Sequence, residues 1–266
     1  VAILAGGGAG HEPAFSGLVG SGLVTVAVSG DVFASPSSKQ ICSGVDLAPT
    51  DKGIVTIVLN YTGDCLNFGL ASEKARSAFH SEGKGRDIEM VNVGDDVSVG
   101  RSKGGLVGRR GLTGAAFTAK VLGAASEKGD DVQKIAHLGR TMVKNFVTVG
   151  SSLDHCHVPG RSTDPKERGA LSQSAVEIGM GIHNEPGAKH IENKPSGEDL
   201  IKEMLELLLR EDDPERSFVK FNKDDDPVLI INNLGGMSSI ELGAIAAEAR
   251  TQIERDWNLR LSRVYC

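Results

Sequence analysis

The first fifteen residues, VAILAGGGAGHEPAF, constrain the fold more than any other stretch of the chain. The apolar residues Val1–Leu4 predict a buried strand, and the run Ala5–Gly10, almost without side chains, predicts a tight turn after it. Glycine permits backbone angles closed to other residues and lets a ligand approach the main chain closely. His11 and Glu12 follow at once, held by Pro13, so a titratable pair is expected where small polar ligands bind, at the carboxyl end of a strand. The glycines are equally typical of a strand-to-helix turn without a ligand.

Two well-known nucleotide-binding signatures are missing from the sequence. A dinucleotide fingerprint needs the spacing G-x-G-x-x-G, but counting from Gly6 the last position is His11. No phosphate loop of the form G-x-x-x-x-G-K-S/T occurs anywhere in the chain. The glycine-rich stretch therefore predicts neither kind of nucleotide site.

Polar residues follow two further runs that predict strands. The run 20–32 leads to Ser35, and the short apolar run Gly53–Leu59 leads to Asp64. Because parallel strands place their carboxyl ends at one edge of a sheet, Gly8, Ser35 and Asp64 are expected to gather there. Ser35 is equally typical of a helix cap, and Asp64 of a loop cap before the helical pattern that follows it.

The remaining pattern alternates strands and helices, which predicts an α/β protein. Further strands are expected at 88–93, 147–158, 175–182, 228–231 and 259–266, and helices at 66–79, 113–128, 131–146, 200–209 and 240–253. The last two helices are introduced by Ser196-x-x-Asp199 and Ser238-x-x-Glu241, which have the spacing of capping boxes. Since the composition changes near Gly150, we predict two α/β subdomains, residues 1–150 and 151–266, each a mostly parallel or mixed sheet with flanking helices.

Composition and charge limit the classes of partner that we expect for this chain. The net charge of −6, with Arg109-Arg110 as the single compact basic pair, argues against a nucleic-acid surface. That pair fits a solvated turn or an anion clamp. Four scattered cysteines without a C-x-x-C motif are typical of free thiols in a reducing compartment. No apolar run approaches the ~18–20 residues that span a bilayer. We predict a cytoplasmic protein without membrane contact and, because the chain begins inside a strand and without Met, a piece of a longer one.

His183 is the candidate for chemistry in the second half of the chain. It lies in the segment GIHNEP, at the end of a predicted strand, where Glu185 can orient the ring and fix its tautomer. A single histidine is also typical of a structural role, and the residues alone leave both open. His155 and His157 raise the question of zinc, but two ligands are too few for a structural site and no C-x-x-C partner exists. We predict no metal site, and the acidic run 224–226 is expected to be solvated.

Six motifs, in order and spanning nearly all of the chain, resemble the K domain of the dihydroxyacetone (glycerone) kinase family. They are GGGAGHEPAFSGLVGSGLVTVAVSGDVFASPS at 6–37, NYTGD with LNFGLA at 60–71, GRRGLTG at 108–114, GSSLDHCHVPGR at 150–161, GMGIHNEPG at 179–187 and INNLGG at 231–236. The motif LDHCHVPGR is most similar to that of the ATP-dependent fungal enzymes with fused domains. The resemblance implies a fold of two α/β subdomains.

The same resemblance implies roles for individual residues. In similar kinases the histidine of the GIHxEPG motif, here His183, adds to the ketone carbon of dihydroxyacetone and forms a covalent hemiaminal. The carboxylate of NYTGD, Asp64, would accept the proton of the attacking hydroxyl. His11 would hydrogen-bond the substrate and help polarise its carbonyl or shuttle a proton. Gly8 would supply backbone contacts and Ser35 a hydroxyl contact.

The family's cofactors and partners follow as expectations. ATP and Mg2+ would bind a separate L domain, in cis or in trans, that this chain lacks, and the product would be dihydroxyacetone phosphate. We expect a homodimer that binds dihydroxyacetone or a related short-chain carbonyl sugar, and an isolated chain that phosphorylates nothing by itself. The alternatives are a non-catalytic substrate sensor or inactive fragment, and the K subunit of a phosphoenolpyruvate-dependent phosphotransferase. Action on glyceraldehyde and cyclisation of flavin nucleotides stay open.

One position departs from the family pattern. The family motif reads K-N-Y-T-G-D, and its lysine touches the substrate hydroxyls, whereas this chain has Leu59. Loss of a charged hydrogen bond costs on the order of 1.5–3 kcal/mol. The departure predicts weakened catalysis, a different substrate, or compensation by Lys39.

Overall fold

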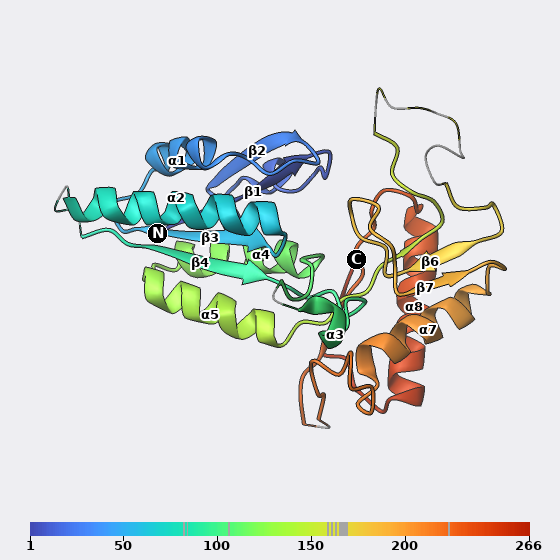
Figure 1. Cartoon of the computed structure of the whole chain (residues 1–266). Helices are drawn as coiled ribbons and strands as arrows, with labels where there is room; N and C mark the ends of the chain where they lie inside the picture. Colours follow the sequence, from blue (N-terminus) through green and yellow to red (C-terminus); the bar gives the residue numbers. More distant parts are fainter. Residues whose placement is uncertain are drawn as a thin grey trace. The chain divides into compact units, whose positions relative to one another are not determined.

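The computed structural model describes residues 1–81, 83, 85–105, 107–158, 160, 162, 164, 170–222 and 224–266 (Figure 1). The chain forms two compact units. Unit 1 comprises Val1–Asp95 with Leu106–Phe146, and unit 2 comprises Asp96–Gly105 with Val147–Cys266. The sequence places one boundary, near Gly150, whereas here the short segment 96–105 also belongs to the second unit.

The described part of unit 1 is built on a four-stranded parallel sheet. Its strands are β1 (Ala2–Ala9), β2 (Val26–Val32), β3 (Ile54–Leu59) and β4 (Ile88–Val93), in the order β2-β1-β3-β4. Every residue of β3 is buried, as expected of a central strand covered on both faces. The prediction of an α/β protein with a parallel sheet and flanking helices is confirmed.

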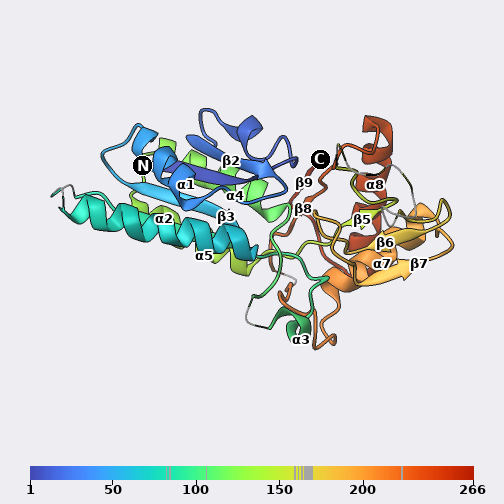
Figure 2. The same cartoon turned by 45° about the horizontal axis from the view of Figure 1, so that its top comes forward.

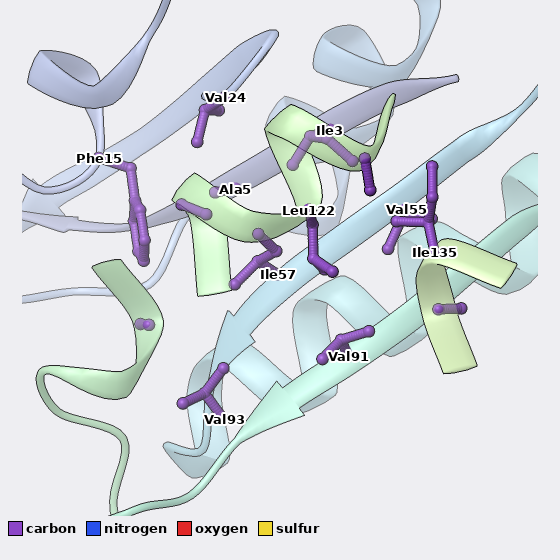
Figure 3. Close-up of a cluster of buried hydrophobic side chains, with 14 of the residues drawn as sticks. Ile3, Ala5, Phe15, Val24, Val55, Ile57, Val91, Val93, Leu122 and Ile135 are labelled. Atoms are coloured by element: carbon purple, nitrogen blue, oxygen red, sulfur yellow. The ribbon is translucent and has the colours of Figure 1, made fainter. Parts of the chain in front are cut away.

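Helices cover both faces of this sheet. On one face α4 (Gly114–Glu127) and α5 (Val132–Lys144) enclose a core that includes alternate residues of the strands, such as Ile3, Val55 and Ile57. Figure 3 shows these side chains converging with Leu122 and Ile135 from the two helices. On the other face α1 (Ser38–Leu47) and α2 (Thr62–Ser81) cover the remaining strand residues, and the short helix η1 (Ser16–Leu18) lies between β1 and β2 in the chain. Because side chains alternate between the two faces of a strand, the same strands contribute to the apolar cores on both faces of the sheet.

The glycine-rich stretch continues the strand instead of turning. The predicted turn at Ala5–Gly10 is wrong, since β1 runs to Ala9 and pairs in parallel with β2 as far as Val32. A Cβ on Gly6 would lie 2.3 Å from the carbonyl oxygen of Val28, so the neighbouring strand leaves no room for a side chain. The chain turns at Gly10, whose φ of 93° lies in the left-handed region that favours glycine.

Two helices of unit 1 begin differently from the prediction. Ser37, and not Ser35, is the N-cap of α1, in a capping box with Gln40. The side chain of Thr113 makes no capping bond to α4. Instead the buried carboxylate of Asp95 accepts hydrogen bonds from the backbone N–H groups of Leu112 (2.7 Å) and Gly114 (2.8 Å). A residue that follows β4 therefore stabilises the start of a helix nineteen positions later.

Unit 2 has smaller sheets in its described ranges. Strands β5 (Ser151–Ser152), β6 (Val176–Ile178) and β7 (Lys189–Ile191) are antiparallel, and β8 (Val228–Ile230) pairs in parallel with β9 (Arg263–Tyr265). Figures 1 and 2 show α7 (Gly197–Leu209) beside β6 and β7, where Ile178 and Leu200 share an apolar cluster. A second cluster joins α7 to α8 (Ser239–Asp256).

The serine N-caps predicted for the last two helices are confirmed. The hydroxyl of Ser196 accepts from the N–H of Asp199, and Ser238 forms a full capping box with Glu241. The predicted strands at 147–158, 175–182 and 259–266 are too long, because β-pairing reaches only Ser151–Ser152, Val176–Ile178 and Arg263–Tyr265. The segment 96–105 contains the short helix α3 (Arg101–Gly104). Within the described ranges, no helix has both the length and the apolar character needed to cross a membrane.

Candidate functional site

The ends of three strands in unit 1 bring the predicted site residues together. A Cβ on Gly8, near the end of β1, would lie 2.7 Å from the backbone nitrogen of Ala34, directly before Ser35. A Cβ on Gly63 would lie 2.7 Å from the hydroxyl of Ser35. Asp64, the next residue, is 6% exposed in the first turn of α2, where the helix dipole favours a carboxylate. The backbone at Gly8, the hydroxyl and the NYTGD motif therefore meet at the carboxyl edge of the sheet.

His11 is held by an aromatic neighbour at this edge. Its ring stacks on Phe33, with centroids 4.7 Å apart and an angle of 19° between the rings. Phe33 has a φ of 52°, which is an outlier for a bulky residue and marks local strain of a kind found at functional sites. The N–H of Gly10 donates to both carboxylate oxygens of Glu12, at 3.1 and 3.0 Å. Backbone hydrogen bonds from Glu12 itself and from Gly10 lower the pKa of that carboxyl.

A second loop is tied to the NYTGD motif, and no local sequence pattern predicts this contact. The side-chain amide of Asn60 donates to the carbonyl oxygens of Val107 (2.6 Å) and Arg109 (2.7 Å). The hydroxyl of Tyr61 donates to the carbonyl of Gly111 at 3.3 Å. The Arg109 guanidinium in turn donates to backbone carbonyls, at 2.9 Å to that of Phe146. This arginine is partly buried and supports the loop, which differs from the solvated turn expected from the sequence.

Leu59 occupies the position where the family pattern has lysine. Its side chain is 9% exposed and belongs to the apolar cluster beneath α4 and α5. A Cβ on Gly111 would lie 2.7 Å from Cδ2 of Leu59, so the side chain packs tightly beneath the adjoining loop. Lys39, the candidate for compensation, is exposed on α1. The position therefore contributes packing and no charge to unit 1.

In unit 2, His183 and Glu185 form a carboxylate–histidine pair. Nδ1 of His183 lies 3.0 Å from Oε1 of Glu185, and the backbone N–H of His183 donates to Oε2 at 2.9 Å. Burial raises the pKa of Glu185, but hydrogen bonds from the His183 ring and from backbone N–H groups outweigh it and lower the pKa to about 2. Since a carboxylate only accepts hydrogen bonds, a neutral ring in this pair has its proton on Nδ1. The ring is 28% exposed.

The loop that carries this pair is bound to the segment containing the LDHCH motif. The side-chain amide of Asn184 makes two hydrogen bonds with the backbone of Cys156. Glu177 on β6 accepts from the N–H of Gly187 and faces Nε2 of His155 at 3.6 Å. These partners lie ten to twenty-eight residues apart in the chain, and the sequence carried no signal for them.

The two histidines of the LDHCH motif have separate partners. Nε2 of His155 faces Glu177, whereas Nε2 of His157 lies 3.3 Å from the carbonyl oxygen of Ser162. In the part of the chain that the structure describes, no group of three or more His, Cys, Asp or Glu side chains could hold a metal ion. The acidic residues 224–226 are exposed.

Comparison with known proteins gives one consistent match. Residues 1–266 match the Dak1 domain family. The chain is 44% identical over 275 residues to a dihydroxyacetone kinase of Pichia angusta, covering 100% of this chain and 44% of that protein. It resembles the crystal structure of the dihydroxyacetone kinase of C. freundii in complex with AMP-PNP and Mg2+, with a TM-score of 0.82 and 33% identity, over 99% of this chain and 44% of that one.

A structure with a different description is equally similar in fold. The dihydroxyacetone kinase operon co-activator Dha-DhaQ superposes with a TM-score of 0.82 at 28% identity, over 100% of this chain and 76% of that one. The chain thus spans less than half of the kinases above and most of the co-activator. A match over the full chain, high identity to the fungal kinase and the shared fold lead to one conclusion: this chain belongs to the Dak1 domain family.

Proposed function

We propose that this chain is the substrate-binding K domain of a dihydroxyacetone kinase, in which His183 captures dihydroxyacetone as a covalent hemiaminal. The observation that carries the proposal is the His183–Glu185 pair, in which Nδ1 of the ring lies 3.0 Å from Oε1 of the carboxylate. It stands in the GMGIHNEPG motif of a chain that matches the Dak1 family over its full length.

The capture step balances with the groups at hand. Nε2 of a neutral ring attacks the ketone carbon, the carbonyl electron pair moves to its oxygen, and that oxygen takes up one proton from the solvent to become the hemiaminal hydroxyl. The ring keeps its proton on Nδ1 and becomes cationic, and the ionised Glu185 stabilises that charge. Glycerol has no carbonyl and forms no such bond, so capture selects ketone over polyol. It also fixes the terminal hydroxyl for phosphoryl transfer, which is a positioning effect.

The residues of unit 1 complete the proposal. Asp64 would accept the proton of the attacking hydroxyl, and His11 would hydrogen-bond the substrate or deliver the proton to the carbonyl oxygen. Gly8 would contribute backbone contacts and Ser35 its hydroxyl. Support for this assignment comes from the meeting of Gly8, Ser35 and the NYTGD motif at one sheet edge, and from the stacking of His11 on Phe33.

ATP and Mg2+ belong to the proposal for the whole kinase, as the resemblance implies. The crystal structure of the related C. freundii kinase with AMP-PNP and Mg2+ supports that choice of cofactors. We propose that both bind a separate L domain, in cis or in trans, that supplies the phosphoryl group. Homodimer formation and a place in cytoplasmic glycerol or short-chain sugar metabolism belong to the same proposal.

The test is direct detection of the adduct. Dihydroxyacetone labelled with 13C at its ketone carbon is added to wild type, His183→Ala and His190→Ala, and the carbon spectrum is recorded. His190 is a matched control because it pairs with Glu192, also two residues away, on an exposed strand. We expect a hemiaminal resonance for wild type and His190→Ala, and its loss in His183→Ala. A signal that survives in His183→Ala contradicts the proposal.

A non-catalytic substrate sensor is the second candidate. It is favoured by the apolar Leu59 and by the similarity to the co-activator structure. Adding the L domain of a related kinase with ATP distinguishes the two: formation of dihydroxyacetone phosphate supports the kinase, and an adduct without product supports the sensor. A K subunit that takes its phosphoryl group from a phosphocarrier protein would respond to that protein instead.

A further inference from the structure

Asn184, directly after His183, has an unusual backbone conformation. Its φ of 63° lies in the left-handed region, which asparagine tolerates better than most residues other than glycine. In this conformation its side-chain amide pairs with both backbone groups of one residue. Oδ1 accepts from the N–H of Cys156 at 2.7 Å, and Nδ2 donates to the carbonyl of Cys156 at 2.9 Å. The strained backbone thus coincides with a two-bond clamp between two segments.

The clamp acts on a part of the loop that the Glu185 pair does not hold. The bonds from His183 to Glu185 fix the ring relative to its own short loop, and Gly181 closes that loop by donating to the carbonyl of Glu185 at 2.9 Å. The Asn184 amide instead ties the loop to the backbone of the LDHCH segment. The carboxylate of Glu177, 8% exposed, ties the far end of the loop through Gly187 and faces the same segment at His155.

We infer that Asn184 is a positioning residue that holds the His183 loop against the LDHCH segment and so fixes where Nε2 points. The inference rests on the proposed function, because its catalytic consequence is the capture of a ketone by Nε2. Bond formation requires the reacting atoms in a near-attack geometry, and an error of about 1 Å in the supporting residues is costly. A loop held only by its own hydrogen bonds would move as a unit and carry the ring, with its Glu185 partner, away from the position that capture requires.

The test uses three variants of the full chain. Asn184→Gly keeps the positive φ and deletes the amide. Asn184→Asp keeps the size and the acceptor but sets a carboxylate oxygen against the Cys156 carbonyl. Asn258→Gly is the matched control, because Asn258 has a φ of 51° and is exposed on the same unit. The readouts are the nitrogen resonances of the His183 ring by long-range 1H–15N NMR, the dissociation constant for dihydroxyacetone, and the thermal midpoint.

We expect both Asn184 variants to bind dihydroxyacetone about tenfold more weakly, the size of effect associated with losing such hydrogen bonds. The His183 ring should keep its wild-type tautomer, because Glu185 belongs to the same loop, but its nitrogen resonances should shift or broaden in both Asn184 variants. The thermal midpoint of Asn184→Gly should match that of Asn258→Gly. Wild-type affinity and ring resonances in Asn184→Gly would overturn the inference, as would the same losses in Asn258→Gly. If wild type forms no adduct, the proposed function fails, and the ring resonances of Asn184→Gly still decide the positioning role.

Discussion

Replacing Glu185 by Gln tests how much the carboxylate beside His183 stabilises a charged ring. Burial raises the pKa of Glu185, and hydrogen bonds from the His183 ring and backbone outweigh it, bringing the pKa from 4.5 to about 2. At ~1.36 kcal/mol per pKa unit this shift corresponds to about 3.4 kcal/mol in favour of the ionised carboxyl, of which the backbone N–H groups supply a part that does not act on the ring. The Glu185 side chain is 35% exposed, so solvent screening reduces the usable part to about 1–2 kcal/mol.

The assay is the affinity for 13C-labelled dihydroxyacetone at pH 8, where an ordinary imidazole is neutral. Glutamine retains a hydrogen-bond acceptor for Nδ1 but removes the negative charge that stabilises the cationic adduct. We expect the adduct of Glu185→Gln to be about 5- to 30-fold weaker than that of wild type, which is 1–2 kcal/mol expressed as an equilibrium constant. The off-site control is Glu192→Gln, since Glu192 also faces a histidine two residues away, at 3.3 Å from His190.

The refuting result is an unchanged affinity in Glu185→Gln, or an equal loss in Glu192→Gln. Acid unfolding supplies an independent check on the magnitude. Because folding lowers the pKa of Glu185, its contribution to stability is present above pH ~4.5 and is lost as the pH falls toward about 2. Wild type should therefore lose its stability advantage over Glu185→Gln across that window, and the two stability curves should converge at the acid end.

Two further predictions concern unit 1. Leu59→Lys places an ammonium in a packed apolar site beneath Gly111, so we expect the free energy of unfolding in urea to fall by about 2–3 kcal/mol, against under about 1.5 kcal/mol for the volume control Leu59→Met. A stable lysine variant that binds substrate more tightly would contradict this assignment of the position to the core. Asp95→Asn turns one of the two oxygens that accept backbone N–H groups at the start of α4 into a donor, so the free energy of unfolding should fall by about 2–3 kcal/mol. The same substitution at the exposed cap of α5, Asp131→Asn, should lower it by about 1 kcal/mol or less, and equal losses would show that burial of Asp95 adds nothing.

The parts of the fold encoded by local patterns were predictable. The strand Ile88–Val93 has the bounds expected from its apolar run, and the serines before α7 and α8 cap those helices as their spacing predicts. A two- or three-residue spacing brings its groups together in a tight turn or at the start of a helix, so the contact needs little from the rest of the chain. The His183–Glu185 pair, with partners two residues apart, belongs to this class.

The features that the sequence did not reveal all depend on partners distant in the chain. Asp95 caps a helix nineteen residues later, and Asn184 binds the backbone of a residue twenty-eight positions earlier. Asn60 reaches carbonyls nearly fifty residues away. An asparagine or aspartate forms such bonds with any backbone that the fold brings near, and its residue type alone names no partner. The roles of His11, Asp64, Gly8 and Ser35 stay predictions, although their local surroundings are now defined.

The crowding around Gly6 and Gly8 limits what the glycine-rich stretch indicates about function in related sequences. Adding one methyl group at either position would drive it into the main chain of the adjoining strand or the loop that follows it, at 2.3 Å and 2.7 Å. Selection for a folded sheet is therefore enough to preserve both glycines, with or without any ligand. A relative without catalytic activity would still carry these glycines, so a search for active members of the family should compare the loop that bears His183.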